Sequence, residues 1–246
     1  MAIKIIDAVL SPGEELPEAD SWLVIDILRA TTTMDAFFSG GGKALYPCPS
    51  IEEAFALRDR LFGEGKQVLL MGERNALPPP GFDLGNSPLE LLEFGPSKRP
   101  EAAMATTNGT SALLKAARSG RPVRPVCARN ARAAARAARG DGRAIGILCA
   151  GLHGRSALDD AACAGLLVEM LLAGGEAELG DGARMALDVW RSCPDMELQL
   201  RRSRHGQRLI GLGFEKDLVF ASAVNSSETL SLFGITKSGD PAIRRV

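Results

Sequence analysis

The sequence predicts an α/β fold with largely parallel or mixed sheets and helices on their faces. Two observations support this prediction. Short apolar runs of the kind that form buried strands alternate with helical stretches along the 246 residues, which is typical of βα units. No clean linker and no repeat divides the chain, so 1–246 is expected to form a single unit. Two closely packed halves, about 1–120 and 121–246, are the alternative.

The first half of the chain is expected to supply five strands. The apolar run Trp22–Ile27 leads into a helix over 31–39. Ser50 fits the N-cap of the next helix with Glu53 at the capping-box position. Ser87 and Pro88 fit the N-cap and first position of another helix. The strands are Lys4–Val9, Trp22–Ile27, Lys43–Tyr46, Gln67–Met71 and Ala102–Ala105.

The second half continues the same alternation. Its expected strands are Val123–Ala128, Ala144–Ala150 and Leu218–Ala223. Its expected helices are Ala131–Arg139, Leu158–Leu172, Asp181–Trp190 and Met196–Leu209, and Lys237–Val246 is expected to be a polar tail.

The composition narrows the class of partner. A net charge of −1 and an aromatic content of 5% argue against a nucleic-acid-binding surface. No apolar run is long enough for a membrane span or a signal peptide. The five cysteines are odd in number and widely spaced, which favours reduced, buried thiols in a cytoplasmic protein.

Four expected strands end in unusually polar segments. Ligands gather at the carboxyl ends of strands in open α/β sheets, so we expect these segments to form a site. Ordinary turn and helix-cap chemistry is the alternative for any one of them. The segments are Asp26–Thr33, Gly72–Arg74, Thr106–Thr110 and Cys149–Gly154, and a Pro/Gly-rich loop adds Asn86 and Ser87.

The residues after the second strand suit an anion and a metal ion. The planar guanidinium of Arg29, the hydroxyls of 31–33 and the free N–H groups of a helix start would suit phosphate. Asp26 is a hard oxygen ligand of the kind that Mg²⁺ prefers. Of the two histidines, His153 follows a strand end and is kept as a substrate ligand, whereas His205 is expected on the surface.

Several motifs resemble those of the 2-phosphosulfolactate phosphatase (ComB) family. They run in family order across nearly the whole chain, and the first and third are the most specific. Ser111 departs from the pattern, because arginine is common there. The motifs are V-I-D-I-L-R-A-T-T-T (24–33), G-E-R (72–74), G-F-D-L-G-N-S-P-L-E (81–90), T-T-N-G-T (106–110), R-N (129–130), C-A-G (149–151), D-x-x-C-A-G (160–165) and D-G-A-x-x-A (181–186).

The resemblance implies an α/β fold and a Mg²⁺-dependent phosphatase. The implied reaction hydrolyses (2R)-2-phospho-3-sulfolactate to (2R)-3-sulfolactate and phosphate, a step of coenzyme M biosynthesis. The substrate is therefore expected to be a small phosphorylated anion. Relatives also occur in organisms without that pathway, so another small 2-phospho-acid is the alternative substrate.

On this basis each candidate residue receives an expected role. The catalytic residues are expected to be Asp26, Arg29 and Thr32, and the Mg²⁺ ligands Asp26 with Glu73 or Asp160. The expected substrate ligands are Arg29, Thr31, Thr32, Thr33, Asn86, Ser87, Thr106, Thr107, Asn108, Gly109, Thr110, Asn130 and His153.

Three alternatives stay open. Asp26 could attack phosphorus and form an aspartyl-phosphate instead of binding the metal. A haloacid-dehalogenase-type phosphatase is disfavoured, because its motif needs an aspartate where Leu28 stands. A non-catalytic anion-binding protein on the same scaffold is the other rival. The sequence does not determine the oligomeric state, and a homodimer is left open.

Overall fold

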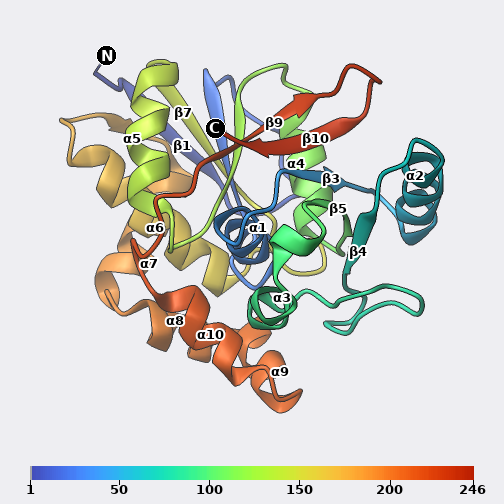
Figure 1. Ribbon diagram of the computed structural model, residues 1–246. Helices are drawn as coiled ribbons and strands as arrows, with labels where there is room; N and C mark the ends of the chain where they lie inside the picture. Colours follow the sequence, from blue (N-terminus) through green and yellow to red (C-terminus); the bar gives the residue numbers. More distant parts are fainter. Residues whose placement is uncertain (1) are drawn as a thin grey trace.

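The computed structural model describes residues 2–246 and has two five-stranded sheets (Figure 1). All strand pairs of the first sheet, sheet A, are parallel. Its order is β6 (Val123–Val126), β2 (Ser21–Ile25), β7 (Ala144–Cys149), β1 (Ile5–Val9) and β8 (Glu178–Leu179). The second, sheet B, is mixed, and its order is β4 (Val68–Gly72), β5 (Glu101–Ala105), β3 (Ala44–Pro47), β10 (Pro241–Arg245) and β9 (Ser231–Ile235).

Helices flank both sheets, which confirms the predicted α/β class. They are α1 (Ala30–Ser39), α2 (Ile51–Gly63), α3 (Pro88–Phe94), the 3₁₀ turn η1 (Pro96–Lys98), α4 (Gly109–Ala117), α5 (Ala131–Asp141), α6 (Leu158–Leu172), α7 (Asp181–Ser192), α8 (Met196–Arg202), α9 (Arg204–Gly211) and α10 (Glu215–Ser222).

Three hydrophobic clusters hold these elements in layers, seen from left to right in Figure 1. The first lies between sheet A and α5, α6 and α7, and includes Ile25 and Leu167. The second fills the space between the two sheets, where α1 and α4 pack, and includes Phe37 and Leu113. The third lies between sheet B and α2. Apolar burial on both faces explains why most strands are continuous apolar runs.

Each sheet takes strands from both ends of the chain. The chain leaves sheet A after β2, returns to it at β6, and adds β9 and β10 to sheet B at its end. The boundary near residue 120 that we considered between two halves does not follow the sheets. The carboxyl ends of β2 and β7 and those of β4 and β5 meet between the sheets, above α8, α9 and α10 at the lower edge of Figure 1.

The local start signals of two helices are confirmed. The Ser50 hydroxyl accepts a hydrogen bond from the N–H of Glu53 at the start of α2. The Ser87 hydroxyl does the same for Glu90, and Pro88 is the first residue of α3. Both caps satisfy a helix N–H group that has no partner within its own helix.

Three predicted elements near the end of the chain are wrong. Leu218–Ala223 is not a strand, since its residues up to Ser222 belong to α10 and Ala223 is the C-cap of that helix. A short apolar run does not distinguish strand from helix. Lys237–Val246 is not a tail, since β10 pairs with β9 and β3 and buries Ile243. The single helix expected over Met196–Leu209 is two, because Ser203 is extended and forms the N-cap of α9.

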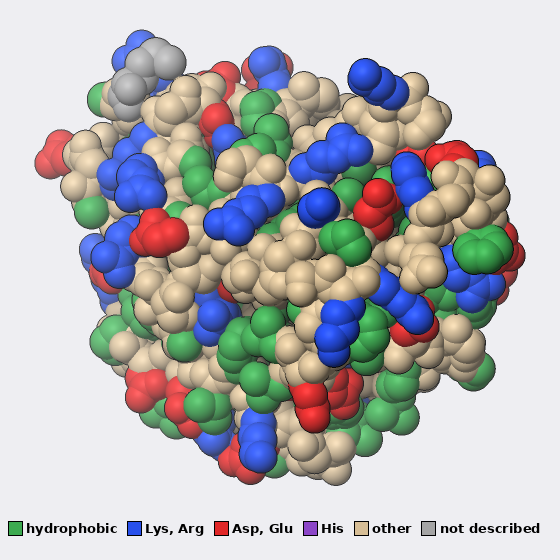
Figure 2. Space-filling model, in the orientation of Figure 1, with side chains coloured by type: hydrophobic (Ala, Val, Ile, Leu, Met, Phe, Trp, Pro, Cys, Tyr) green, Lys and Arg blue, Asp and Glu red, His purple; other side chains and the backbone are tan. Residues whose placement is uncertain are grey.

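The surface agrees with the near-zero net charge. On the face shown in Figure 2, Lys and Arg side chains lie in separate groups between acidic, apolar and other atoms. Within residues 2–246, no helix is both long enough and apolar enough to cross a membrane.

The tight contact between α6 and α7 leads to a stability prediction. A Cβ atom on Gly165 would lie 2.0 Å from the carbonyl oxygen of Ala186, so Gly165→Ala must push the two helices apart. We expect the free energy of unfolding to fall by about 3 kcal/mol in chemical denaturation. Gly140→Ala in α5 is the control, because no atom lies within 4 Å of its Cβ position. That change should add up to about 1 kcal/mol. Equal effects of the two substitutions would contradict the packing argument.

Candidate active site

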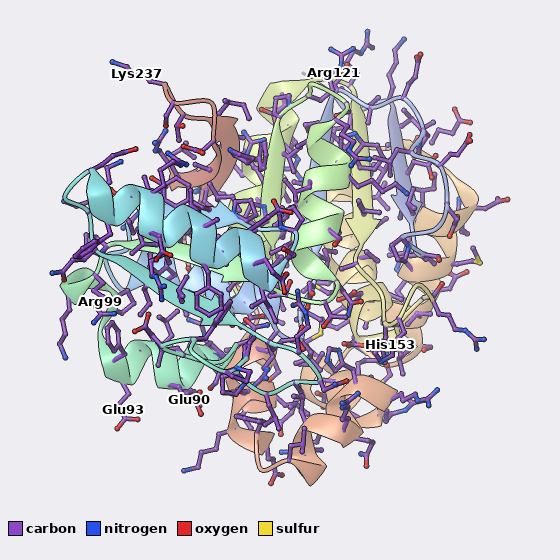
Figure 3. The ribbon with its side chains drawn as sticks, turned by 90° about the vertical axis from the view of Figure 1, so that its right-hand side faces the viewer. Glu90, Glu93, Arg99, Arg121, His153 and Lys237 are labelled. Carbon is purple, nitrogen blue, oxygen red and sulfur yellow. The ribbon has the colours of Figure 1, made fainter. Side chains whose placement is uncertain are left out.

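One pocket collects side chains from all four polar strand ends. Of the predicted residues, it is lined by Asp26 and Arg29 after β2, Glu73 after β4, Thr107 and Asn108 after β5, His153 after β7 and Asn86 from the Pro/Gly loop. Figure 3 places His153 in the loops at the lower end of the sheets, next to the helices α8 to α10. The empty space inside these walls, including its opening to solvent, is about 430 Å³.

The three threonines after β2 shape the turn into α1. Their hydroxyls donate to backbone carbonyls at 2.7–3.0 Å: Thr31 to Asp26, Thr32 to Ile27 and Thr33 to Arg29. The three side chains are buried and do not line the pocket. In this structure their hydroxyls therefore hold the loop that carries Asp26 and Arg29, and the substrate contacts expected of them stay a prediction.

Arg29 is the centre of a buried ion pair that the sequence did not indicate. Its Nη1 donates to Asp217 at 2.8 Å, and its Nη2 donates to the carbonyl of Ala76 at 2.7 Å. The guanidinium lies 4.3 Å from the centre of the Phe214 ring. The other oxygen of Asp217 accepts from the hydroxyl of Ser87 at 2.7 Å. Much of the Arg29 charge is thus already compensated, although the residue borders the pocket.

Asp26 and Glu73 are the carboxylates that face the pocket. Burial raises the pKa of Asp26 from 3.8 to about 6, against the opposing effects of nearby His205 and of the Ala30 N–H. Burial also acts to raise the pKa of Glu73, but N–H groups of Thr107 and Ala76 donate to its two oxygens. These bonds hold the pKa of Glu73 below its usual value.

Asp160 is buried and connects two of the loops that form the pocket. Its two oxygens accept the N–H groups of Ile27 at 3.0 Å and Gly151 at 2.8 Å, so the carboxylate joins the loop after β2 to the loop after β7. Burial, together with the charges of Asp159 and Asp26, raises its pKa well above the usual value. Asp160 does not line the pocket, and this placement does not favour the metal ligation expected of it.

Other predicted ligands also have structural partners. Thr106 and Thr110 hydrogen-bond each other across the turn before α4. Asn130 accepts the N–H of Cys127 and donates to the carbonyl of Thr229, which joins the loop after β6 to the segment before β9. Gly109 packs against Asp26, because a Cβ atom there would lie 2.6 Å from its Oδ2. None of these four residues lines the pocket.

The sequence analysis missed the wall of the pocket formed by α9. His205, expected on the surface, lines the pocket, as does Arg208 one turn further along the helix. The N-cap Ser203 and the small Gly206 were the available signal, because they mark a separate helix start that brings both side chains to one face. Asn75 and Ala76, also missed, line the pocket with φ of 58° and 70°. Such left-handed backbone in residues other than glycine clusters at functional sites.

Known proteins resemble this chain over most of its length. A family model described as 2-phosphosulpholactate phosphatase matches residues 9–234. A relative from Thermus thermophilus is 45% identical over 217 residues, which cover 88% of this chain and 89% of the relative. One from Deinococcus radiodurans is 41% identical over 222 residues, 90% of each chain. A third, from Thermotoga maritima, is 34% identical over 227 residues, 92% of this chain and 94% of the relative. All three are named probable 2-phosphosulfolactate phosphatase.

The Arg29–Asp217 pair generates a second stability prediction. Both side chains are 2% exposed, so Asp217→Ala would leave a buried guanidinium without its counter-charge. We expect the free energy of unfolding to fall by about 3–5 kcal/mol. Glu228→Ala, which breaks the exposed pair with Arg136, should cost less than about 1 kcal/mol. If Asp217→Ala lowered the free energy of unfolding as little as the control does, the buried pair would not stabilise the fold as we expect.

The raised pKa of Asp26 generates a third stability prediction. The folded protein holds this proton more tightly than the unfolded chain, so the ionised carboxylate destabilises the fold as pH rises from 3.8 toward 6. Without divalent metal, Asp26→Asn should therefore be more stable than the wild type at pH 7.5, by up to about 3 kcal/mol. The difference should shrink toward pH 4.5. Denaturant titrations with chelator at both pH values test this, and a variant less stable than the wild type at pH 7.5 would refute it.

Proposed function

The chain belongs to the 2-phosphosulfolactate phosphatase family, and we propose that it is a phosphoric monoester hydrolase that converts 2-phosphosulfolactate to sulfolactate and phosphate. For the stereochemistry we propose (2R)-2-phospho-3-sulfolactate as substrate and (2R)-3-sulfolactate as product. The corresponding place in metabolism is a step of the coenzyme M biosynthesis type. The names of the relatives support the reaction, and the pocket supports it independently.

The observation that carries the proposal is the composition of that pocket. Its lining combines two carboxylates, Asp26 and Glu73, with hydrogen-bond donors and with cationic side chains. Phosphoryl transfer requires little covalent chemistry from the protein, and depends on positioning and on neutralising the phosphate oxygens. A pocket of mixed charge at the carboxyl ends of strands suits that task.

We propose Mg²⁺ as the cofactor, held by Asp26 and Glu73. Within residues 2–246, no group of three His, Cys, Asp or Glu side chains forms a ready metal cage. Mg²⁺ does not need one, since it commonly binds one or two carboxylates, several waters and a substrate phosphate. The donor set also fits, because the Oδ1 of Asn86 is buried without a hydrogen-bond partner among the described residues and borders the same pocket.

The charges of the pocket support the proposal of a bound cation. Asp26 and Glu73 would repel a phosphorylated, sulfonated substrate, and Arg29 is already paired with Asp217. When bound, Mg²⁺ would neutralise these carboxylates and the phosphate oxygens. Arg208 is exposed at the rim, where its Nη2 lies 3.2 Å from the carbonyl of Asn75 and no carboxylate of residues 2–246 pairs with it. We propose that Arg208 binds the sulfonate or carboxylate of the substrate.

The remaining walls would orient the phosphate. Thr107 and Asn108 stand at the turn before α4, and His153 is exposed on the loop after β7 and lines the same pocket. We propose that these three side chains hydrogen-bond the substrate and keep the phosphorus in line with its attacker. Either a water molecule or Asp26 itself supplies the attacking oxygen, and only the second route passes through an aspartyl-phosphate.

Phosphate release tests the proposed function. The purified protein with Mg²⁺ should release phosphate from 2-phosphosulfolactate, and chelation should abolish release. Asp26→Asn should lower kcat at least 100-fold, because it removes the proposed metal ligand or nucleophile. Arg136→Ala is the control and should keep full activity, because Arg136 is an exposed residue of α5 that does not line the pocket.

The pattern of results separates the alternatives. Binding of 2-phosphosulfolactate without turnover would mean an anion-binding protein on this scaffold. Faster release from another 2-phospho-acid, such as 2-phospholactate, would mean that the reaction is right and the substrate wrong. Near-normal kcat after Asp26→Asn would refute the role of Asp26.

A further inference from the structure

His205 and Asp159 form a pair at the pocket that the proposed metal and anion sites do not use. The Nδ1 of His205 lies 3.3 Å from the Oδ2 of Asp159. The Asp159 side chain is 2% exposed and that of His205 is 15% exposed, so the pair joins the interior to the pocket. The other ring nitrogen, Nε2, makes no hydrogen bond to any described residue, and His205 lines the pocket.

The structure places this histidine firmly. Ser203 caps α9 by accepting the N–H of Gly206 at 2.8 Å. Gly206 in turn packs closely on α8, because a Cβ atom there would lie 1.9 Å from the carbonyl oxygen of Leu200. His205 therefore stands in the first turn of a helix that is held at its start on both sides. A side chain carried by a firmly placed helix start and paired with a buried carboxylate is suited to proton transfer.

The charge around the pair favours the imidazolium form. Burial acts to lower the pKa of His205, but the hydrogen bond and the charge of Asp159 outweigh it and raise the pKa above the usual value. The charge of Asp26 acts in the same direction, and that of Arg29 opposes it. His205 forms an ion pair with Asp159 and with no other carboxylate of residues 2–246.

Apart from the pair with His205, the Asp159 carboxylate makes no side-chain hydrogen bond or ion pair to residues 2–246. Its Oδ1 is buried and has no hydrogen-bond partner among residues 2–246. A buried carboxylate with one unpaired oxygen costs stability, whereas an apolar residue of similar size would not. Such a cost is expected where a group orients a catalytic side chain, as the aspartate does in Ser-His-Asp triads.

We propose that His205, oriented by Asp159, is the general acid that donates the Nε2 proton to the bridging ester oxygen of the substrate. The inference rests on the proposed phosphatase function and adds the group that makes the alcohol leave. As the phosphorus–oxygen bond breaks, its electron pair goes to the ester oxygen, which takes the proton and becomes the hydroxyl of the product alcohol. A water oxygen ends on phosphorus, and the proton that this water releases restores the imidazolium.

This role predicts a dependence on the leaving group. An alkoxide is a poor leaving group and needs the proton, whereas an enolate or a nitrophenolate leaves without it. His205→Gln should therefore lower kcat for 2-phosphosulfolactate or 2-phospholactate by about 10²–10⁴-fold. It should lower kcat for phosphoenolpyruvate and 4-nitrophenyl phosphate by less than about 10-fold. Asp159→Asn, which changes the positioning residue, should show the same selectivity with a smaller loss.

The test is a series of kcat measurements on all esters that the wild type hydrolyses, with unfolding curves to show that the variants are folded. If His205→Gln does not fold, His205→Asn takes its place, because its amide can still donate to Asp159. Equal losses for good and poor leaving groups, or no loss, would overturn the role of His205 while leaving the phosphatase function intact. A wild type that hydrolyses none of the esters would overturn both.

Discussion

The buried ion pair between Arg29 and Asp217 joins segments that are far apart in the sequence. Arg29 follows β2 in sheet A and also binds the carbonyl of Ala76, in the loop after β4 of sheet B. Asp217 belongs to α10 and accepts the hydroxyl of Ser87 at the start of α3. One guanidinium and one carboxylate thus connect a loop of each sheet to the helices α3 and α10. Because the pocket lies between these segments, its shape depends on the pair even if neither group touches the substrate.

A concentration of buried carboxylates is the second constraint. Asp26, Asp159 and Asp160 are each at most 6% exposed. The charge of Asp159 acts to raise the pKa of Asp26 and that of Asp160, and the charge of Asp26 also acts to raise the pKa of Asp160. Backbone N–H groups at the strand ends, the pair with His205 and the start of α6 compensate part of this charge. The uncompensated negative charge of Asp26 and Glu73 is available to a cation. The negative charge that the fold leaves uncompensated therefore lies where the proposed chemistry takes place. Active sites often cost stability in this way.

Much of the fold and about half of the pocket could be predicted from local patterns. Strand ends such as Asp26 and Glu73 are visible because an apolar run stops at a charged residue, and parallel strands bring such ends together. The partner of Arg29 was not visible, since Asp217 lies 188 positions away, directly before a segment that was predicted to be a strand. His205 was missed for a related reason. A dense arginine pattern hid the break at Ser203, and that break alone turns the side chain toward the pocket.

The interleaving of the two sheets also affects how the protein is made. One partner of strand β3 is synthesised last, because Leu45 pairs with Ile243, which lies almost two hundred residues later in the chain. During synthesis on the ribosome, sheet A can gain β7 and β8 while sheet B still lacks two of its five strands. The open edge of β3 is then exposed to pairing with other chains, and contacts of such long sequence separation form slowly. The last hairpin of the chain thus covers the edge of β3 and completes sheet B.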